Sequence, residues 1–485
     1  MKFRNIKFYI FILSLFFIFP MAAFADNTGD RQNFYVEKNY SLNDSTQASA
    51  TLLKAPDMLY FYVENDWWNS KTEAQKNDIS VALDKLGAEF NSKIYPKLTS
   101  TFGNEATPGV DKDRRITVLF YRTTNSVKGY VRNIDEYEKT VNPLSNQREM
   151  VYINADLITG SYIDEIMSHE FMHLITINQK ELRIGTPEDT WLNEALSEYA
   201  VTYLGYNDKE DSYLNQRISA FLDKPYDSLT NWTGSQYDYG VVNAFINYLV
   251  DQYGLNILTD SLKSNKTGIQ SLDEALAKNN HKETISDIFT DWTIASYVND
   301  CTLGARYCYT DNNLKDLHII PFGNFLPFSG ESTLYLGQTL MNYSANWQKF
   351  SGGKGELKID LSNPSGVNMT IFYVIKSATG ETSIGTMKLT NQEGELVIPD
   401  MGQNVYSVTV IPSIHDDSIS ASDGKAYFYS ITANTINNDG QSQNADTIKL
   451  PFSIDKPLSQ MNREELLTVL LKVIIYLVVH GKTIF

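Results

Sequence analysis

"SHEFMHLITINQ" (168–179) sets two histidines four residues apart around a glutamate, in an otherwise apolar stretch of a chain that has only six histidines. Residues four apart lie on one face of a helix, because each residue turns the chain by roughly 100°. His169 and His173 can therefore bind one metal ion, with Glu170 beside it. The alternative is a core helix with two satisfied histidines, but that helix would also bury Glu170 without a partner, which is costly.

A catalytic zinc ion needs a third protein ligand and one open position. The helix predicted by "TWLNEALSEYAVTYLG" (190–205) offers Glu194, 21 residues after His173. Glu198 follows one turn later on the same face, where it can accept the second N–H of a ligand histidine. Taken alone, Glu194 and Glu198 also fit a solvated helix face. After the histidine pair, we expect Glu194 to be the third ligand and Glu170 to move a proton between the zinc-bound water and the leaving amine.

"HEFMHLITINQ" followed by "WLNEALSEYA" resembles the gluzincin metallopeptidases, whose third zinc ligand is a glutamate on a downstream helix. "NEALSE" is similar to the thermolysin pattern NEAxSD, and "WLNE" to the aminopeptidase pattern WLNEG. The combination most resembles the hyicolysin family of secreted bacterial neutral proteases, over about residues 55–300. The resemblance implies zinc ligands at His169, His173 and Glu194, and a catalytic acid/base at Glu170. Glu198 stands where thermolysin has an aspartate.

A donor is also needed to stabilise the oxyanion that forms when water attacks a peptide carbonyl. In "QYDYGVVNAFINYLVDQYG" (236–254), Tyr237 precedes Gly240 by three residues and resembles the tyrosine of the YxKG pattern in gluzincin aminopeptidases, with Tyr239 in place of the lysine. We predict Tyr237 as the oxyanion donor and Tyr239 as the second candidate. A packing role is the alternative, since the chain contains 30 tyrosines.

The first 25 residues have a basic start, an apolar run and "AAFA" ending at Ala25, which is typical of a cleaved secretory signal peptide. We therefore expect a secreted, extracellular protein. Removing this segment changes the net charge from −17 to −20, which argues against nucleic acid as a partner because phosphate binding needs a basic face. Residues 26–55 are polar and predict a leader or linker.

The remaining chain predicts an α+β fold: a gluzincin (thermolysin-like) catalytic domain followed by an all-β sandwich. Its mixed α/β part covers 56–180, with strands at 58–65, 114–121 and 148–156 and a helix over 71–98 that stops around Pro96. The helical part covers 181–330. The expected helices from the motif onward are 162–179, 190–204, 212–223, 238–253, 271–279 and 282–299. Short strands separated by Gly, Asn and Asp turns predict the sandwich at 331–450.

Cys301 and Cys308 are the only cysteines, and in a secreted protein they most simply form one structural disulfide. The final segment, 451–485, contains an apolar helical pattern (463–482) that Lys472 interrupts. It is short for a membrane span, so we expect a packed or partner-seeking helix and no transmembrane span in the mature chain. Calcium is compatible with acidic clusters such as "DKD" (111–113), but no EF-hand loop is present.

These features predict a secreted zinc endopeptidase that acts on protein or peptide substrates. The β-rich tail would serve as an accessory module for surface or matrix association. The chain segment "KGYVRN" (128–133) is a candidate for an edge strand that binds an extended peptide. The first alternative is an aminopeptidase of the same clan, although no GxMEN-type segment for the substrate amine occurs in 114–165. The second is a secreted adhesin on a dead protease fold, which has no need of Glu170.

Overall fold

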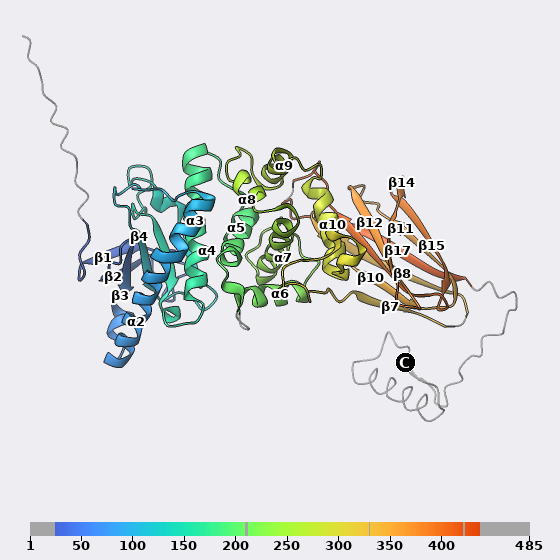
Figure 1. The fold of residues 1–485 in the computed structure, drawn as a ribbon, viewed down its shortest axis with the longest axis horizontal. Coiled ribbons are helices and arrows are strands. Elements are labelled where there is room, and N and C mark those ends of the chain that lie inside the picture. Colours follow the sequence, from blue (N-terminus) through green and yellow to red (C-terminus); the bar gives the residue numbers. More distant parts are fainter. Residues whose placement is uncertain (1–24, 209–211, 329, 421, 437–485) are drawn as a thin grey trace, which may run out of the picture.

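The computed structural model describes residues 25–208, 212–328, 330–420 and 422–436. The chain runs from an N-terminal sheet, through a helical middle, to a β-rich end (Figure 1). The predicted signal peptide, apart from Ala25, and the apolar segment 463–482 lie outside the described residues. Within the described ranges, no helix is both long enough and apolar enough to cross a membrane.

The N-terminal sheet has six strands in the order β1-β2-β3-β4-β6-β5. They are β1 (Arg31–Tyr35), β2 (Gln47–Lys54), β3 (Leu59–Glu64), β4 (Ile116–Tyr121), β5 (Gly129–Val131) and β6 (Met150–Asn154). β3, β4 and β6 are parallel neighbours, whereas β5 pairs antiparallel with β6 and ends the sheet, with no strand on its other edge among the described residues. Strands β3, β4 and β6 occur where the sequence predicts them.

Residues 26–55 are not the leader or linker that their polar composition suggests. They contain β1 and β2, which pair with each other and, through β2, with β3. Their buried side chains, Phe34, Ala48, Ala50 and Leu52, form a second small core on the outer face of the sheet together with tyrosines of the inner strands. The prediction of a leader or linker is wrong because the hydrophobic pattern of β2 is weak. Buried and more exposed residues alternate along this strand, but most of the buried residues are alanine.

The helices on the other face of the sheet include the one that carries the HExxH stretch. They are α1 (Asn65–Asn69), α2 (Glu73–Glu89), α3 (Tyr95–Phe102) and α4 (Ile163–Thr176), with one π-helical turn at Phe90–Ile94 and another at Ile177–Leu182. The single helix predicted over 71–98 is thus α2, a π turn and α3. Pro96 does not stop it: it lies in the first turn of α3, where a missing N–H costs nothing.

The middle of the molecule is helical, as predicted. Its helices are α5 (Thr190–Tyr203), α6 (Tyr213–Asp223), α7 (Gln236–Tyr253), α8 (Asn256–Ser261), α9 (Gly268–Lys278) and α10 (Ile285–Val298). Only α8 is absent from the prediction. α7 and α10 begin with capping boxes, at Ser235 and Thr284, which satisfy free backbone N–H groups at their starts. The predicted disulfide between Cys301 and Cys308 is present just after α10.

The C-terminal region is β-rich and begins at Phe322, before the predicted boundary at 331. Its strands are β7 (Phe322–Leu326), β8 (Ser332–Leu340), β9 (Ser344–Ala345), β10 (Gln348–Gly352), β11 (Gly355–Ser362), β12 (Met369–Ser377), β13 (Thr382–Met387), β14 (Leu389–Thr390), β15 (Glu393–Met401), β16 (Val405–Ile414) and β17 (Tyr427–Ile436). A single residue pair, Met401 with Val405, joins the β15–β11–β17–β8 group to the β13–β12–β16–β10–β7 group. Both groups contribute to one hydrophobic core.

The β-rich region packs directly on α10. The Trp347 indole donates a hydrogen bond to the carbonyl of Thr293 (3.0 Å), and the hydroxyls of Tyr297 and Thr409 are 2.8 Å apart. Trp347 also belongs to the large core that contains the helices. The two parts therefore share buried contacts and are not joined by a linker alone.

Candidate metal centre and cleft

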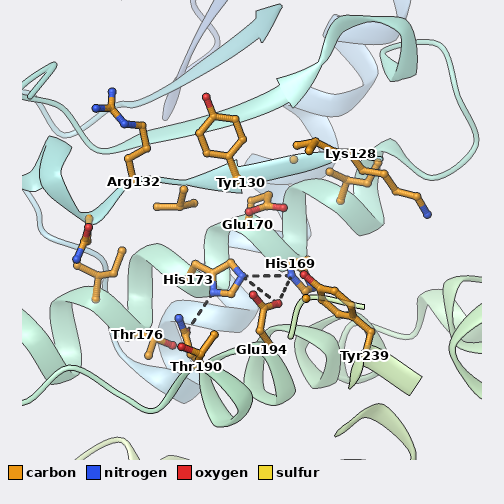
Figure 2. Close-up of a pocket in the computed structure, with 18 of the residues that line it drawn as sticks. Lys128, Tyr130, Arg132, His169, Glu170, His173, Thr176, Thr190, Glu194 and Tyr239 are labelled. Carbon is orange, nitrogen blue, oxygen red and sulfur yellow. Dashed lines mark hydrogen bonds and ion pairs between the residues drawn. The ribbon is translucent and has the colours of Figure 1, made fainter. Parts of the chain in front are cut away.

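The HExxH stretch lies on α4, a helix buried around nearly its whole circumference. Such a helix belongs in the core of a domain, and here it lies between the sheet and α5. His169 and His173 extend from the same face, with their rings 4.9 Å apart and their Nε2 atoms 3.2 Å apart (Figure 2). The spacing of four residues therefore places two imidazoles together, as predicted.

Glu194 on α5 completes a cluster of three possible ligands. Its Oε2 lies 3.3 Å from Nε2 of His169 and 3.6 Å from Nε2 of His173. For zinc bonds of about 2.0–2.1 Å, tetrahedral geometry separates two ligand atoms by about 3.3 Å. Oε2 of Glu194 is buried and has no hydrogen-bond donor in the described part of the chain. The residues present thus fit a zinc ion in both donor type and spacing.

The other ring nitrogen of each histidine faces an oxygen. Nδ1 of His173 lies 3.1 Å from Oδ1 of Asn193 and 3.1 Å from Oγ of Ser197. Nδ1 of His169 lies 3.5 Å from Oε1 of Glu198, on the side expected from the sequence. An acceptor at Nδ1 favours the tautomer with a free lone pair at Nε2, the form that binds a metal.

Glu198 is fully buried and is itself held by two further side chains. Arg217 of α6 donates to both carboxylate oxygens, with its Nη2 2.7 Å from Oε1, and Asn243 of α7 donates to Oε2 at 2.9 Å. Arg217 and Asn243 are not predictable from the sequence, because nothing in the local pattern connects α6 and α7 to α5. Asn193 and Ser197 are also absent from the predicted site, although they lie four residues apart on the helix that carries Glu194, and this spacing could have identified them.

The charges in this cluster depend on one another. Burial alone would lower the pKa of His173, but the negative charge of the nearby Glu194 carboxylate raises that pKa to about 9. Burial would raise the pKa of Glu194, but His173 and His169 hold it well below its usual range. The site thus concentrates negative charge that attracts a cation or a proton.

Glu170 lies beside the cluster and faces the edge strand of the sheet. It is 5% exposed, and its Oε2 is buried without a hydrogen-bond partner in the described part of the chain. Burial raises its pKa, while His169 and His173 act in the opposite direction. A Cβ added at Gly129 of β5 would lie 2.7 Å from Oε1 of Glu170, so the glycine leaves the space that the carboxylate occupies.

Tyr239, and not Tyr237, lies at the cleft. Its ring centroid is 6.5 Å from that of His169, and Figure 2 shows it beside the cluster. Burial, followed by the charge of Glu194, raises the pKa of Tyr239 and keeps its hydroxyl protonated. Tyr237 is two residues away, about 200° around α7, and contacts Lys224 outside the cleft. The placement of Tyr237 in the site is therefore wrong.

The cluster opens into a cleft of about 820 Å³. Residues 126–134, which include β5 and the "KGYVRN" segment, form one wall. Lys128 lies on the Tyr239 side of the centre and Arg132 on the side of Thr176 and Thr190 (Figure 2). The free edge of β5 offers main-chain groups to an extended peptide.

No protein-family model matches the chain, and no curated protein matches it. The pre-peptidase C-terminal domain of a collagenase from Bacillus anthracis is 10% identical, with a TM-score of 0.18 over 24% of this chain and 96% of that chain. The mitogen from Yersinia pseudotuberculosis is 13% identical, with a TM-score of 0.16 over 23% of this chain and 92% of that chain. A periplasmic inhibitor of g-type lysozyme from Aeromonas hydrophila is 10% identical, with a TM-score of 0.15 over 24% and 97%. At these scores the likenesses carry no argument about this chain.

Proposed function

We propose that the protein is a secreted zinc-dependent endopeptidase of the gluzincin type, acting on protein or peptide substrates. One observation carries the proposal: the ligand atoms of His169, His173 and Glu194 lie 3.2–3.6 Å apart, directly beside the buried carboxylate of Glu170. Three protein ligands leave a fourth position for water or substrate, which is the arrangement of catalytic rather than structural zinc. When bound, a zinc ion would lower the pKa of a water molecule and polarise the substrate carbonyl.

The chain's own residues then have separate tasks. The free edge of β5 holds the substrate extended by main-chain hydrogen bonds. Glu170 accepts the proton of the attacking water and passes it to the leaving amine, a task that suits a carboxyl whose pKa is raised by burial. The Tyr239 hydroxyl donates to the carbonyl oxygen as negative charge develops on it. Glu198 with Arg217, and Asn193 with Ser197, hold the two imidazoles in place.

The length of the cleft wall formed by residues 126–134 favours endopeptidase activity over aminopeptidase activity. β5 passes the centre, and the cleft continues from Lys128 on one side to Arg132 on the other (Figure 2). A substrate can therefore occupy positions on both sides of the scissile bond. Peptides with blocked and free N-termini separate the two activities: an endopeptidase cleaves both, whereas an aminopeptidase cleaves only the free form.

The decisive variant is Glu170→Gln, which keeps the shape of the side chain but cannot accept the proton. We expect it to retain one zinc ion per chain and to lose casein hydrolysis by several orders of magnitude. Zinc content by elemental analysis and the thermal midpoint of unfolding are the controls for an intact site. If the variant cleaves casein as fast as the parent, the proposal is wrong. If the purified parent binds no zinc, a binding protein on a protease-like fold becomes the better explanation.

A further inference from the structure

Most charged side chains that line the cleft outside the metal cluster and Glu170 already have a partner of opposite charge. These ion pairs are Arg132 with Glu37 (3.0 Å), Glu188 with Lys180 (3.1 Å) and Arg217 with Glu198 (2.7 Å). Two charged residues of the lining, Lys128 and Glu181, have no oppositely charged side chain within ion-pair distance in the described part of the chain. A substrate can therefore still pair with these two charges.

Lys128 lies at the end of the cleft near Tyr239 (Figure 2). Its Nζ is 4.4 Å from the centroid of the Tyr213 ring and 3.4 Å from Oε1 of Gln216. Both partners are neutral and belong to α6, so they hold the lysine without cancelling its charge. Burial lowers the pKa of Lys128, and the charge of Arg217 adds to this effect. A carboxylate bound beside Lys128 would act in the opposite direction.

Glu181 lies at the opposite end, on the π turn Ile177–Leu182 that extends the HExxH helix. Its carboxylate accepts a hydrogen bond from the Tyr137 hydroxyl (2.7 Å) and longer ones from Nδ2 of Asn133 (3.4 Å). Burial, followed by the hydrogen bond to Glu181, raises the pKa of Tyr137 to about 12, so this hydroxyl stays a donor. These partners are also neutral, and they fix the carboxylate while leaving its negative charge uncompensated.

Strand β5 connects the two ends of the cleft. Lys128 directly precedes this strand, and Glu181 contacts Asn133, five residues further along the wall. At about 3.3 Å per residue, five residues of extended chain span about 17 Å. A peptide paired with β5 has the same rise per residue. Two of its side chains about five residues apart can therefore reach both ends of the cleft at once.

We propose that the substrates are extended peptides that carry an acidic side chain at the Lys128 end of the cleft and a basic side chain at the Glu181 end. This inference rests on the proposed peptidase function and names its substrate class. Like charges placed together are strongly unfavourable, so the cleft rejects the reversed charge order as well as favouring the matching one. Because a peptide can pair with β5 in either direction, both charge orders are compared in the test.

Three internally quenched peptides with blocked ends and an apolar centre provide the test. The first carries glutamate and, five residues later, lysine; the second has the reverse order, and the third has glutamine at both positions. The zinc-loaded parent should hydrolyse one charge order with a kcat/KM at least about tenfold above that of the other, with the glutamine peptide between them. In the full-length, zinc-loaded Glu170→Gln protein, Kd values from isothermal titration should differ in the same direction, because the charges act on binding.

Charge reversal in the protein identifies the residues responsible. The double variant Lys128→Glu with Glu181→Lys keeps the net charge and should reverse the preferred order. The single variants Lys128→Gln and Glu181→Gln should each lower the kcat/KM ratio by about threefold, since each removes one of two charge contacts. The matched control is Lys139→Glu with Glu138→Lys, which exchanges two adjacent exposed charges that do not line the cleft. It should keep the parental order and ratio.

The possible failures of the two proposals are distinguishable. A parent that hydrolyses all three peptides at similar rates refutes the charge selection and leaves the peptidase function standing. A double variant that retains zinc and the thermal midpoint of unfolding but keeps the parental order also refutes the charge selection. If the double variant does not fold, the two glutamine variants decide, because an unchanged ratio in either is a contradiction. A parent that cleaves neither the peptides nor casein refutes the peptidase function, and the charge selection with it.

Discussion

Gly129→Ala perturbs the proposed catalytic carboxylate without touching a zinc ligand. The backbone of Gly129 lies in β5 and has no positive φ, so alanine fits the strand itself. The added methyl group would lie 2.7 Å from Oε1 of Glu170, 3.0 Å from its Cγ and 3.1 Å from its Cδ. Ordinary van der Waals contact begins near 3.4 Å, so the carboxylate must move by about 0.7 Å or the strand must yield.

A displacement of this size matters because proton transfer needs the carboxylate within hydrogen-bond reach of the water. A misplacement of about 1 Å costs on the order of 10²-fold in rate, so we expect kcat to fall by roughly 10–100-fold. KM should change much less, since the free edge of β5 remains available. The assay is steady-state hydrolysis of a blocked, internally quenched peptide, combined with zinc analysis and thermal unfolding.

Gly323→Ala is the matched control. A Cβ at Gly323 would meet only the Phe325 ring, at 3.7 Å, far from the cleft. It should leave kcat unchanged. If Gly129→Ala hydrolyses the peptide at the parental rate while zinc and stability are retained, then Glu170 does not act from the position that the structure shows. If activity and zinc are lost together, the substitution disturbs the fold or the metal site. The prediction that Gly129→Ala displaces only the Glu170 carboxylate is then wrong.

Tyr239→Phe should lower kcat by about 10²–10³-fold, the usual cost of losing an oxyanion donor, whereas Tyr237→Phe should leave kcat near the parental value; the reverse order would assign the donor to Tyr237. The free energy of unfolding should depend on pH through Asp291, because burial raises the pKa of this carboxyl to about 6. The charge of Arg306 opposes the shift, whereas the charges of Asp287 and Glu283 add to it. This folded-state pKa lies above the unfolded value of about 4. The contribution of Asp291 to the free energy of unfolding is therefore fully present below about pH 4 and is lost as the pH rises through 6. The loss is at most about 3 kcal/mol. Asp291→Asn should flatten this part of the profile in urea unfolding between pH 4 and 7, and an unchanged fall would contradict the assignment.

The sequence predicts the positions of most helices well, although α4 and α10 are buried around nearly their whole circumference and have no clear apolar stripe. The helix over 162–179 is α4 plus its π turn, and those over 190–204, 212–223 and 282–299 match α5, α6 and α10 within three residues at each end. Strands β1 and β2, within residues 26–55, are not predicted from the sequence, because their burial depends on pairing with β3 rather than on strong local hydrophobicity. Short alternating stretches with alanine at the buried positions are not distinguishable from a polar linker by period alone.

The three candidate metal ligands are predictable from the sequence because local spacing relates them. His169 and His173 are related by local helical spacing, and Glu194 lies on the very next helix. The residues that support them are related only through tertiary packing. Arg217 reaches Glu198 from α6, and its guanidinium also lies over the rings of Tyr213 and Tyr239, at 4.3 and 4.2 Å from their centroids. No sequence spacing connects these groups before the helices are placed.

The same packing explains why Tyr237 was the wrong choice. In the sequence, Gly240 marks Tyr237, three residues earlier, as the oxyanion tyrosine through its resemblance to the YxKG pattern. In the structure, a Cβ at Gly240 would lie 2.6 Å from the backbone N of Phe221 and 2.9 Å from the carbonyl oxygen of Arg217. The glycine is therefore needed for the close approach of α6 to α7. That approach fixes the rotation of α7, and with it Tyr239 is placed at the cleft, stacked on the arginine that also holds Glu198.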